Sequence, residues 1–160
     1  MRYQDVLDAQ ALQAIYRHAA ATYPEECCGF VFADAYVHCG ENIQNQLNRL
    51  DPDVYRRSAA NGYTFAVADT LLLNRSLRSG NPVRVIYHSH PDVGAYFSRE
   101  DADKALFMGQ PIHPVAYLVV DVRAGEPLGA KLFEWNGATF VCSREYPGST
   151  TAREKKEVWL

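Results

Sequence analysis

Residues 83–101 constrain this chain of 160 residues more than any other stretch. Its first part, residues 83–87, is β-branched and aromatic, which predicts a strand that enters the core. Because side chains alternate along a strand, His88 and His90 project from the same face. At ~3.3 Å of rise per residue their α-carbons lie roughly 6–7 Å apart, so the two imidazoles can converge on one metal ion.

A short polar pattern follows the histidines. Ser98 stands three residues before Asp101 and opens a segment rich in helix formers, residues 102–108, which ends at Gly109. On its own, Ser-x-x-Asp is a helix-capping pattern whose carboxylate pairs with free backbone N–H groups. Beside two histidines, however, Asp101 also becomes a candidate ligand. Two histidines and one aspartate leave a fourth zinc position for water, as expected of a catalytic site.

The spacing of these residues resembles the JAMM motif of the MPN (JAB) metalloprotease family, which reads His-x-His, seven residues, Ser, two residues, Asp. The four positions correspond to His88, His90, Ser98 and Asp101. The family also has a glutamate far upstream, three residues before a glycine and ahead of a short hydrophobic strand. Residues 24–32 have this form and assign the position to Glu26. Without the resemblance, Glu26 reads as an exposed carboxylate at a strand end.

The resemblance implies a zinc cofactor held by His88, His90 and Asp101. Zinc lowers the pKa of bound water from about 15.7 to about 7 and polarises the carbonyl under attack. Glu26 is then implied as the proton shuttle, bonded to the metal's water rather than to the metal. Ser98 would donate to the developing oxyanion, a contribution of about 2.7–4 kcal/mol at other oxyanion sites.

Other catalytic chemistries fit the sequence less well. A nucleotide deaminase needs H-x-E with P-C-x-x-C, and a zincin needs H-E-x-x-H; the chain has neither. A cysteine protease built on Cys28 and His88 stays open, although an apolar run would raise the pKa of the thiol. The four cysteines form no disulfide framework or C-x-x-C pattern, so we expect free thiols.

Composition indicates an ordinary globular chain, with 48% hydrophobic and 22% charged residues. We expect one domain over residues 1–146 and a loosely held tail over residues 147–160. A net charge of −3 offers no basic field, so we expect no nucleic acid and no membrane as partner. Without an apolar signal segment or a run of about 18 apolar residues, a cytoplasmic location is expected.

The remaining elements follow from periodicity. Helices are expected from Asp8 to before Pro24 and over residues 69–77, ended by Gly80. Strands are expected over residues 28–32, 35–39, 115–120, 130–135 and 138–141, the last after the hairpin pair Asn136-Gly137. Residues 41–63 lack periodicity and are expected to be a surface connection. This order predicts the α/β class, a single mixed sheet flanked by helices. The resemblance implies the MPN (JAB) fold, which is cytidine-deaminase-like.

The substrate class is also an expectation from the resemblance. Residues 86–90 and 95–101 are similar to those of compact bacterial members that release an amino acid or short peptide from a sulfur-carrier protein of the ubiquitin fold. We therefore expect a zinc metallopeptidase or isopeptidase that cuts after the C-terminal Gly-Gly of such a carrier, with residues 41–63 recognising its folded body. The alternatives are a deubiquitinase-like protease of a bacterial conjugation pathway, a cell-wall peptidase of the phage-tail type, and a non-catalytic MPN scaffold.

Overall fold

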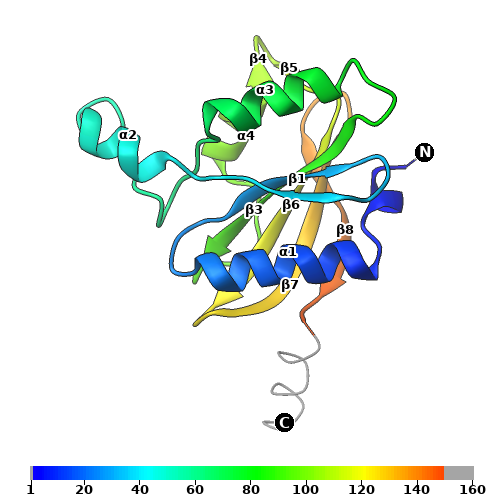
Figure 1. Cartoon of the computed structure of the whole chain (residues 1–160), viewed down its shortest axis with the longest axis horizontal. Helices are drawn as coiled ribbons and strands as arrows, with labels where there is room; N and C mark the ends of the chain where they lie inside the picture. Colours follow the sequence, from blue (N-terminus) through cyan, green and yellow to red (C-terminus); the bar gives the residue numbers. More distant parts are fainter. Residues whose placement is uncertain (1, 150–160) are drawn as a thin grey trace, which may run out of the picture.

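The computed structural model describes residues 2–149 and contains one main sheet with helices around it (Figure 1). The helices are η1 (Tyr3–Val6), α1 (Ala9–Thr22), α2 (Gln44–Leu50), α3 (Val67–Ser76) and α4 (Arg99–Ala105). The main sheet contains β1 (Cys28–Phe32), β2 (Val37–Cys39), β3 (Val83–Pro91), β6 (Ala116–Arg123), β7 (Glu126–Trp135) and β8 (Phe140–Pro147). A separate hairpin is formed by β4 (Leu106–Phe107) and β5 (Gln110–Pro111).

The strand order of the main sheet is β2-β1-β3-β6-β7-β8. Strands β3 and β6 pair in parallel and every other neighbouring pair is antiparallel, so the sheet is mixed, as the sequence predicts. Parallel neighbours need a crossover connection, and here α4 is part of it. The carboxyl end of β3 therefore leads, through one loop, to the first turn of α4.

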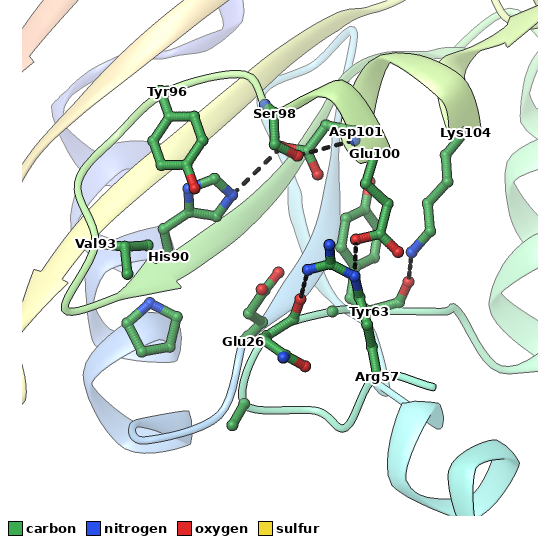
Figure 2. Close-up of a pocket in the computed structure, with 14 residues that line it drawn as sticks. Glu26, Arg57, Tyr63, His90, Val93, Tyr96, Ser98, Glu100, Asp101 and Lys104 are labelled. Atoms are coloured by element: carbon green, nitrogen blue, oxygen red, sulfur yellow. Dashed lines mark hydrogen bonds and ion pairs between the residues drawn. The ribbon is translucent and has the colours of Figure 1, made fainter. Parts of the chain in front are cut away.

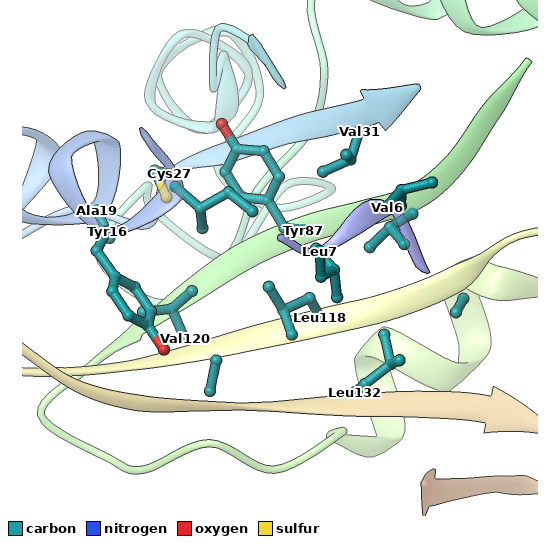
Figure 3. Close-up of a cluster of buried hydrophobic side chains, with 14 of the residues drawn as sticks. Val6, Leu7, Tyr16, Ala19, Cys27, Val31, Tyr87, Leu118, Val120 and Leu132 are labelled. Carbon is teal, nitrogen blue, oxygen red and sulfur yellow. The ribbon is translucent and has the colours of Figure 1, made fainter. Parts of the chain in front are cut away.

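Two hydrophobic clusters cover the two faces of the sheet. On one face, Ile15, Tyr16 and Ala19 of α1 pack against inward residues of the strands, among them Tyr87 and Leu118 (Figure 3). On the other face, α3 and α4 contribute their apolar side chains to a cluster that contains residues of β1, β3 and β6. Alternation along β3 places Tyr87 toward α1 and therefore places His88 and His90 toward α4.

A close contact explains the glycine that follows Glu26 by three residues. The Tyr87 ring lies directly against Gly29, and a β-carbon built at Gly29 would collide with the Tyr87 hydroxyl and with the His38 carbonyl. The Tyr87 hydroxyl bonds to His18 Nδ1 at 2.7 Å. Only glycine lets the buried tyrosine cross β1 here, so Gly29 serves the packing between β1 and β3.

Helix α1 begins where the sequence predicts. The Asp8 side chain accepts a hydrogen bond from the Ala11 N–H at 2.8 Å and so caps the helix, an interaction that typically contributes about 1 kcal/mol. The helix ends at Thr22, before Pro24.

One local expectation was wrong, and another was incomplete. The helix expected to reach residue 108 ends at Ala105, because Met108 and Gly109 both adopt positive φ angles and turn the chain into the hairpin of β4 and β5. The connection at residues 41–63 contains a helix, α2, which projects from the main body in Figure 1. Its sequence is largely polar and amide-rich, so it lacks the apolar period that signals a helix packed on a core.

The end of the described chain is held by hydrogen bonds. Pro147 belongs to β8, and its carbonyl accepts a bond from the Tyr16 hydroxyl at 2.7 Å. The Ser149 N–H bonds to the Pro127 carbonyl at 3.2 Å. The rest of the tail expected to be loosely held, residues 150–160, lies outside the described residues. Over residues 2–149, no helix is both long enough and apolar enough to cross a membrane.

Candidate metal centre

Strand β3 presents the two histidines at its carboxyl end, as the alternation predicts. The ring of His88 is fully buried and that of His90 nearly so, and their Nε2 atoms lie 3.2 Å apart. Ser89 points to the opposite face, where its hydroxyl accepts a hydrogen bond from the Cys27 N–H at 2.8 Å. The strand thus fixes both histidines and, through Ser89, ties itself to the segment that carries Glu26.

The first turn of α4 brings in the third group. Ser98 is the N-cap, and its hydroxyl accepts the Asp101 N–H while the Asp101 carboxylate accepts the Ser98 N–H, both at 3.0 Å. The same carboxylate reaches both histidines, with Oδ1 at 3.2 Å from His88 Nε2 and Oδ2 at 3.3 Å from His90 Nε2. Asp101 can therefore be both a capping residue and a metal ligand, because the capping hydrogen bonds orient its carboxylate toward the histidines.

Glu26 lies just before β1 and is also buried, with 5% of its surface exposed. It forms with His88 and His90 a group whose possible ligand atoms all lie within 4.8 Å of one another. Glu26 and Asp101 therefore both lie close to the two histidines. The alternative interpretation, an exposed carboxylate at a strand end, is therefore wrong for Glu26.

The arrangement of donors fits a metal ion. The Nδ1 of His90 lies 3.0 Å from the Gly94 carbonyl, which can only accept, so Nδ1 carries a proton. In the neutral ring Nε2 is then the nitrogen that can bind a metal ion. Within residues 2–149 the buried Nδ1 of His88 has no hydrogen-bond partner. Two imidazole nitrogens and a carboxylate that converge within 3.3 Å form the N and O donor set that zinc binds.

The pKa values at the centre follow from burial and neighbouring charge. Burial raises the pKa of Glu26 to about 7, against the opposing attraction of His90. Burial also lowers the pKa of His88. For His90 the effect of burial is outweighed by the hydrogen bond to Asp101 and the charge of Glu26, so its pKa is raised. For Asp101, burial is outweighed by the two histidines, which hold its pKa well below its usual range.

The centre lies in the wall of a cleft of about 280 Å³ (Figure 2). One side of the cleft is formed by Glu26, His90, Ser98 and Asp101, with Tyr96 at the edge of the His90 ring. The other side is formed by residues 60–63 and by three charged side chains that connect this segment to α4. Those connecting residues are Arg57, Glu100 and Lys104.

Tyr63 stacks on the buried metal-site histidine. Its ring lies 4.6 Å from the His88 ring at an interplanar angle of 27°, and the ammonium of Lys104 lies 4.5 Å from the centre of the Tyr63 ring. The same ammonium donates a hydrogen bond to the Tyr63 carbonyl. Arg57 forms an ion pair with Glu100 of α4. These contacts hold the outer wall of the cleft against the helix that provides Asp101.

The structure brings together all five residues that the sequence singles out: Glu26, His88, His90, Ser98 and Asp101. Sequence reasoning missed Tyr63, Lys104 and the amide of Asn42, whose side chain bonds to the Glu26 carbonyl at 2.9 Å. Asn42 and Tyr63 lie in the segment between β2 and α3, for which no periodic signal exists, and Lys104 contacts that segment from α4. The density of Asn and Gln in residues 42–48 was the one available sign, since amides satisfy irregular backbone.

The cysteine-protease alternative is not supported. Cys28 is fully buried in β1, and burial raises the pKa of its thiol, which disfavours the nucleophilic thiolate. Cys27 is also buried, with its pKa raised to about 12. Two of the three remaining histidines have other contacts: His18 bonds to Tyr87, and His38 pairs with Asp69 at 2.7 Å. The third, His113, lines a different cleft.

Comparison with known proteins agrees with this geometry. The family model described as prokaryotic homologs of the JAB domain matches residues 8–135. The chain belongs to this family. Zinc metalloproteases occur among JAB domains, and the buried group of Glu26, His88 and His90 is compatible with a metallo-isopeptidase site. No curated protein matches the chain.

Two solved structures illustrate the shared fold. A protein from Desulfitobacterium hafniense is 20% identical, with a TM-score of 0.54 over 83% of this chain and 86% of that protein. A protein from Salinibacter ruber is 26% identical, with a TM-score of 0.54 over 86% of this chain and 87% of that protein. Both are similar in fold over nearly the whole described structure.

Proposed function

We propose that the protein is a zinc-dependent metallopeptidase that hydrolyses the bond after the C-terminal Gly-Gly of a ubiquitin-fold protein, with a sulfur carrier as the preferred substrate. One observation carries the proposal: the Asp101 carboxylate lies within 3.3 Å of both histidine Nε2 atoms, in the wall of an open cleft that also contains Glu26. A purely structural site would instead use a fourth protein ligand and be closed.

The roles of the residues follow from their protonation. His88, His90 and Asp101 would hold the zinc, which when bound supplies Lewis acidity and an activated water. In the metal-free protein burial raises the pKa of Glu26 to about 7, so this carboxyl is a stronger base than an exposed glutamate and can both accept and return a proton. Its carboxylate lies beside the ligands rather than in exposed solvent, so it can deliver the proton to the leaving amine.

Ser98 has a defined donor role. Its oxygen already accepts the Asp101 N–H, so the hydroxyl hydrogen remains to donate into the cleft. A hydroxyl in this place would stabilise negative charge that develops on the scissile carbonyl oxygen.

The shape of the cleft supports a slender substrate tail. Strand β3 is paired on both sides, by β1 and β6, so an extended tail cannot add to it and would lie along the outer wall at residues 60–63. Ala60 and Gly62 bring no bulky side chain to that wall, so the backbone of two consecutive glycines can approach it closely. Backbone pairing with such a tail reads no side chains, so a folded body is needed for specificity.

The projecting helix α2 and the loop after it offer a surface for that body. Three apolar side chains there are exposed: Leu50 at 78%, Val54 at 67% and Tyr55 at 38%. Small clusters of exposed apolar and aromatic side chains of this kind are typical of protein contacts. We propose that this surface contacts the carrier. We also propose that the reaction takes place in the cytoplasm.

The test is incubation of the zinc-loaded protein with a folded ubiquitin-fold carrier extended past its Gly-Gly, followed by mass spectrometry. We expect cleavage directly after the second glycine, lost in His88→Ala and when the glycines are made bulky, and weak turnover of the isolated tail peptide. Equal cleavage of the peptide would refute recognition of the folded body. Cleavage of a conjugated lysine side chain or of cell-wall peptides alone would assign the alternative substrates. A purified protein that binds no zinc would instead be a scaffold.

A further inference from the structure

We propose that Asn42 is a positioning residue that fixes the general base Glu26 and the outer wall of the cleft relative to each other. The catalytic consequence rests on the proposed function, whereas the positional claim rests on geometry alone. Asn42 lies between β2 and α2, outside the cleft, and carries none of the chemistry proposed above.

All four hydrogen-bonding positions of the Asn42 amide are used. Its Nδ2 donates to the Glu26 carbonyl at 2.9 Å and to the Gly62 carbonyl at 3.0 Å. Its Oδ1 accepts from the Gln44 N–H at 3.0 Å and from the Thr64 N–H at 3.2 Å. Since carbonyls only accept and N–H groups only donate, the network itself determines which end of the amide is oxygen.

Glu26 depends on these bonds because it precedes β1 and so is outside the sheet ladder. Its N–H donates to the Ala59 carbonyl at 2.7 Å and its carbonyl accepts from Asn42, so both backbone groups are held by the segment 42–59. The second bond of the same Nδ2 goes to Gly62, in the wall of the cleft. The side-chain amide of Asn42 therefore joins the backbone of Glu26 to the backbone of Gly62 in the facing wall of the cleft.

Asn42 itself is well anchored. Its backbone forms an antiparallel bridge with Phe65, and the Ile43 N–H bonds to the Thr64 carbonyl at 2.9 Å. Two neighbouring amides strengthen the same connection. Gln44 donates to the Arg57 carbonyl at 3.0 Å, and Asn45 accepts the Ala59 N–H at 2.8 Å while it donates to Glu25. These bonds hold the first turn of α2 in place, and Asn42, which directly precedes the N-cap of this helix, reaches Glu26 with its side chain.

No similar side chain can replace this amide. Aspartate has the same shape but would face two carbonyl oxygens with a third oxygen, so it loses both donor bonds. Alanine removes all four bonds without adding a charge. Asn48 provides a matched control, because its Nδ2 donates to a carbonyl of the same segment, that of Tyr55, at 2.7 Å.

The experiment compares Asn42→Asp, Asn42→Ala and the control Asn48→Asp in the zinc-loaded full chain. For Asn42→Asp we expect kcat to fall on the order of 10²-fold, because the variant releases the backbone of Glu26 and the wall at Gly62. Zinc content should stay unchanged, because the ligands lie on β3 and α4. At saturating carrier, Asn48→Asp should keep kcat, because Asn48 bonds to Tyr55 rather than to Glu26 or Gly62. Its place on α2, the proposed carrier surface, means that only KM should change. In the Glu26→Gln background, Asn42→Asp should lower kcat no further, and any effect of the released wall at Gly62 should appear in KM. Additive losses in kcat would overturn the proposal.

A second measurement does not need turnover. Hydrogen exchange followed by NMR should show that the Glu26 amide loses protection in Asn42→Asp and in Asn42→Ala but not in Asn48→Asp. Unchanged protection at Glu26 in both Asn42 variants would refute the positioning role, and Asn42→Ala decides the point if Asn42→Asp does not fold. If the wild-type protein cleaves no carrier, the proposed function fails, while hydrogen exchange still judges the role of Asn42.

Discussion

Replacing Glu26 by glutamine should stabilise the metal-free protein at neutral pH. Burial raises the pKa of Glu26 from its ordinary value of 4.5 to about 7, so between these values the folded state binds a proton that the unfolded state has lost. Such a group contributes stability that is present below pH 4.5 and lost as the pH rises through about 7. Glutamine has nearly the same shape and stays neutral, so the variant avoids this loss.

The size of the effect follows from the pKa. At about 1.36 kcal/mol per pKa unit, the change from 4.5 to about 7 corresponds to about 3 kcal/mol in the free energy of unfolding above pH 7. With 95% of its surface buried, Glu26 is little screened by solvent. Burial lowers the pKa of His88, and both histidines remain in the variant. The attraction between Glu26 and His90, which raises the pKa of His90, opposes the effect of burial on Glu26 and is already contained in its pKa of about 7.

The assay is urea unfolding of chelator-treated wild type and Glu26→Gln at pH 4.5, 6 and 7.5. The two proteins should be nearly equal at pH 4.5, and the variant should be more stable by about 2–3 kcal/mol at pH 7.5. Glu25→Gln is the matched control, since it makes the same change one residue away on a half-buried side chain that bonds to Asn45, and it should give no such gain. A Glu26→Gln variant that is less stable at pH 7.5, or whose effect does not vary with pH, would show that the carboxylate is not buried as described.

Three further predictions concern zinc and turnover. In His88→Ala and Asp101→Ala both zinc content, measured by mass spectrometry of the intact metal complex, and hydrolysis should be lost; retained zinc in both would remove the proposed ligand set. Ser98→Ala should lower kcat on the order of 10²-fold with zinc retained, and the lost cap should lower the free energy of unfolding by about 1 kcal/mol. An unchanged kcat would show that Ser98 only caps α4 and does not donate to the oxyanion. Tyr63→Leu should weaken zinc binding about 10-fold or more in competition with a chelator, whereas Tyr63→Phe should not, because the stacked ring rather than the hydroxyl orients His88; equal loss in both would contradict this.

Spacing alone located the candidate ligands because their geometry is local. His88 and His90 share a face of β3 through strand alternation, and Asp101 is placed by a cap that spans three residues. The order of helices and strands along the chain likewise predicted a single mixed sheet flanked by helices. In these cases the period of the side chains is itself the structural information.

The segment between β2 and α3 could not be derived in this way. Its helix, α2, packs little apolar surface, so no hydrophobic period indicates it, and the sequence predicts only a surface connection. Asn42, Gln44 and Asn45 act through hydrogen bonds to backbone groups of other segments. A backbone carbonyl has no residue type, so such a bond leaves no mark in the sequence that would name its partner.

The chain by itself thus determined which chemical groups are available at the carboxyl end of one strand and the start of one helix. Only the tertiary structure decided that Glu26, more than 60 residues upstream of the histidines, lies beside them, and that burial moves its pKa to about 7. Burial is a property of everything packed around a group. It depends on the wall of residues 57–63 and on the amide of Asn42, which act on Glu26 across distances in sequence that no local pattern encodes.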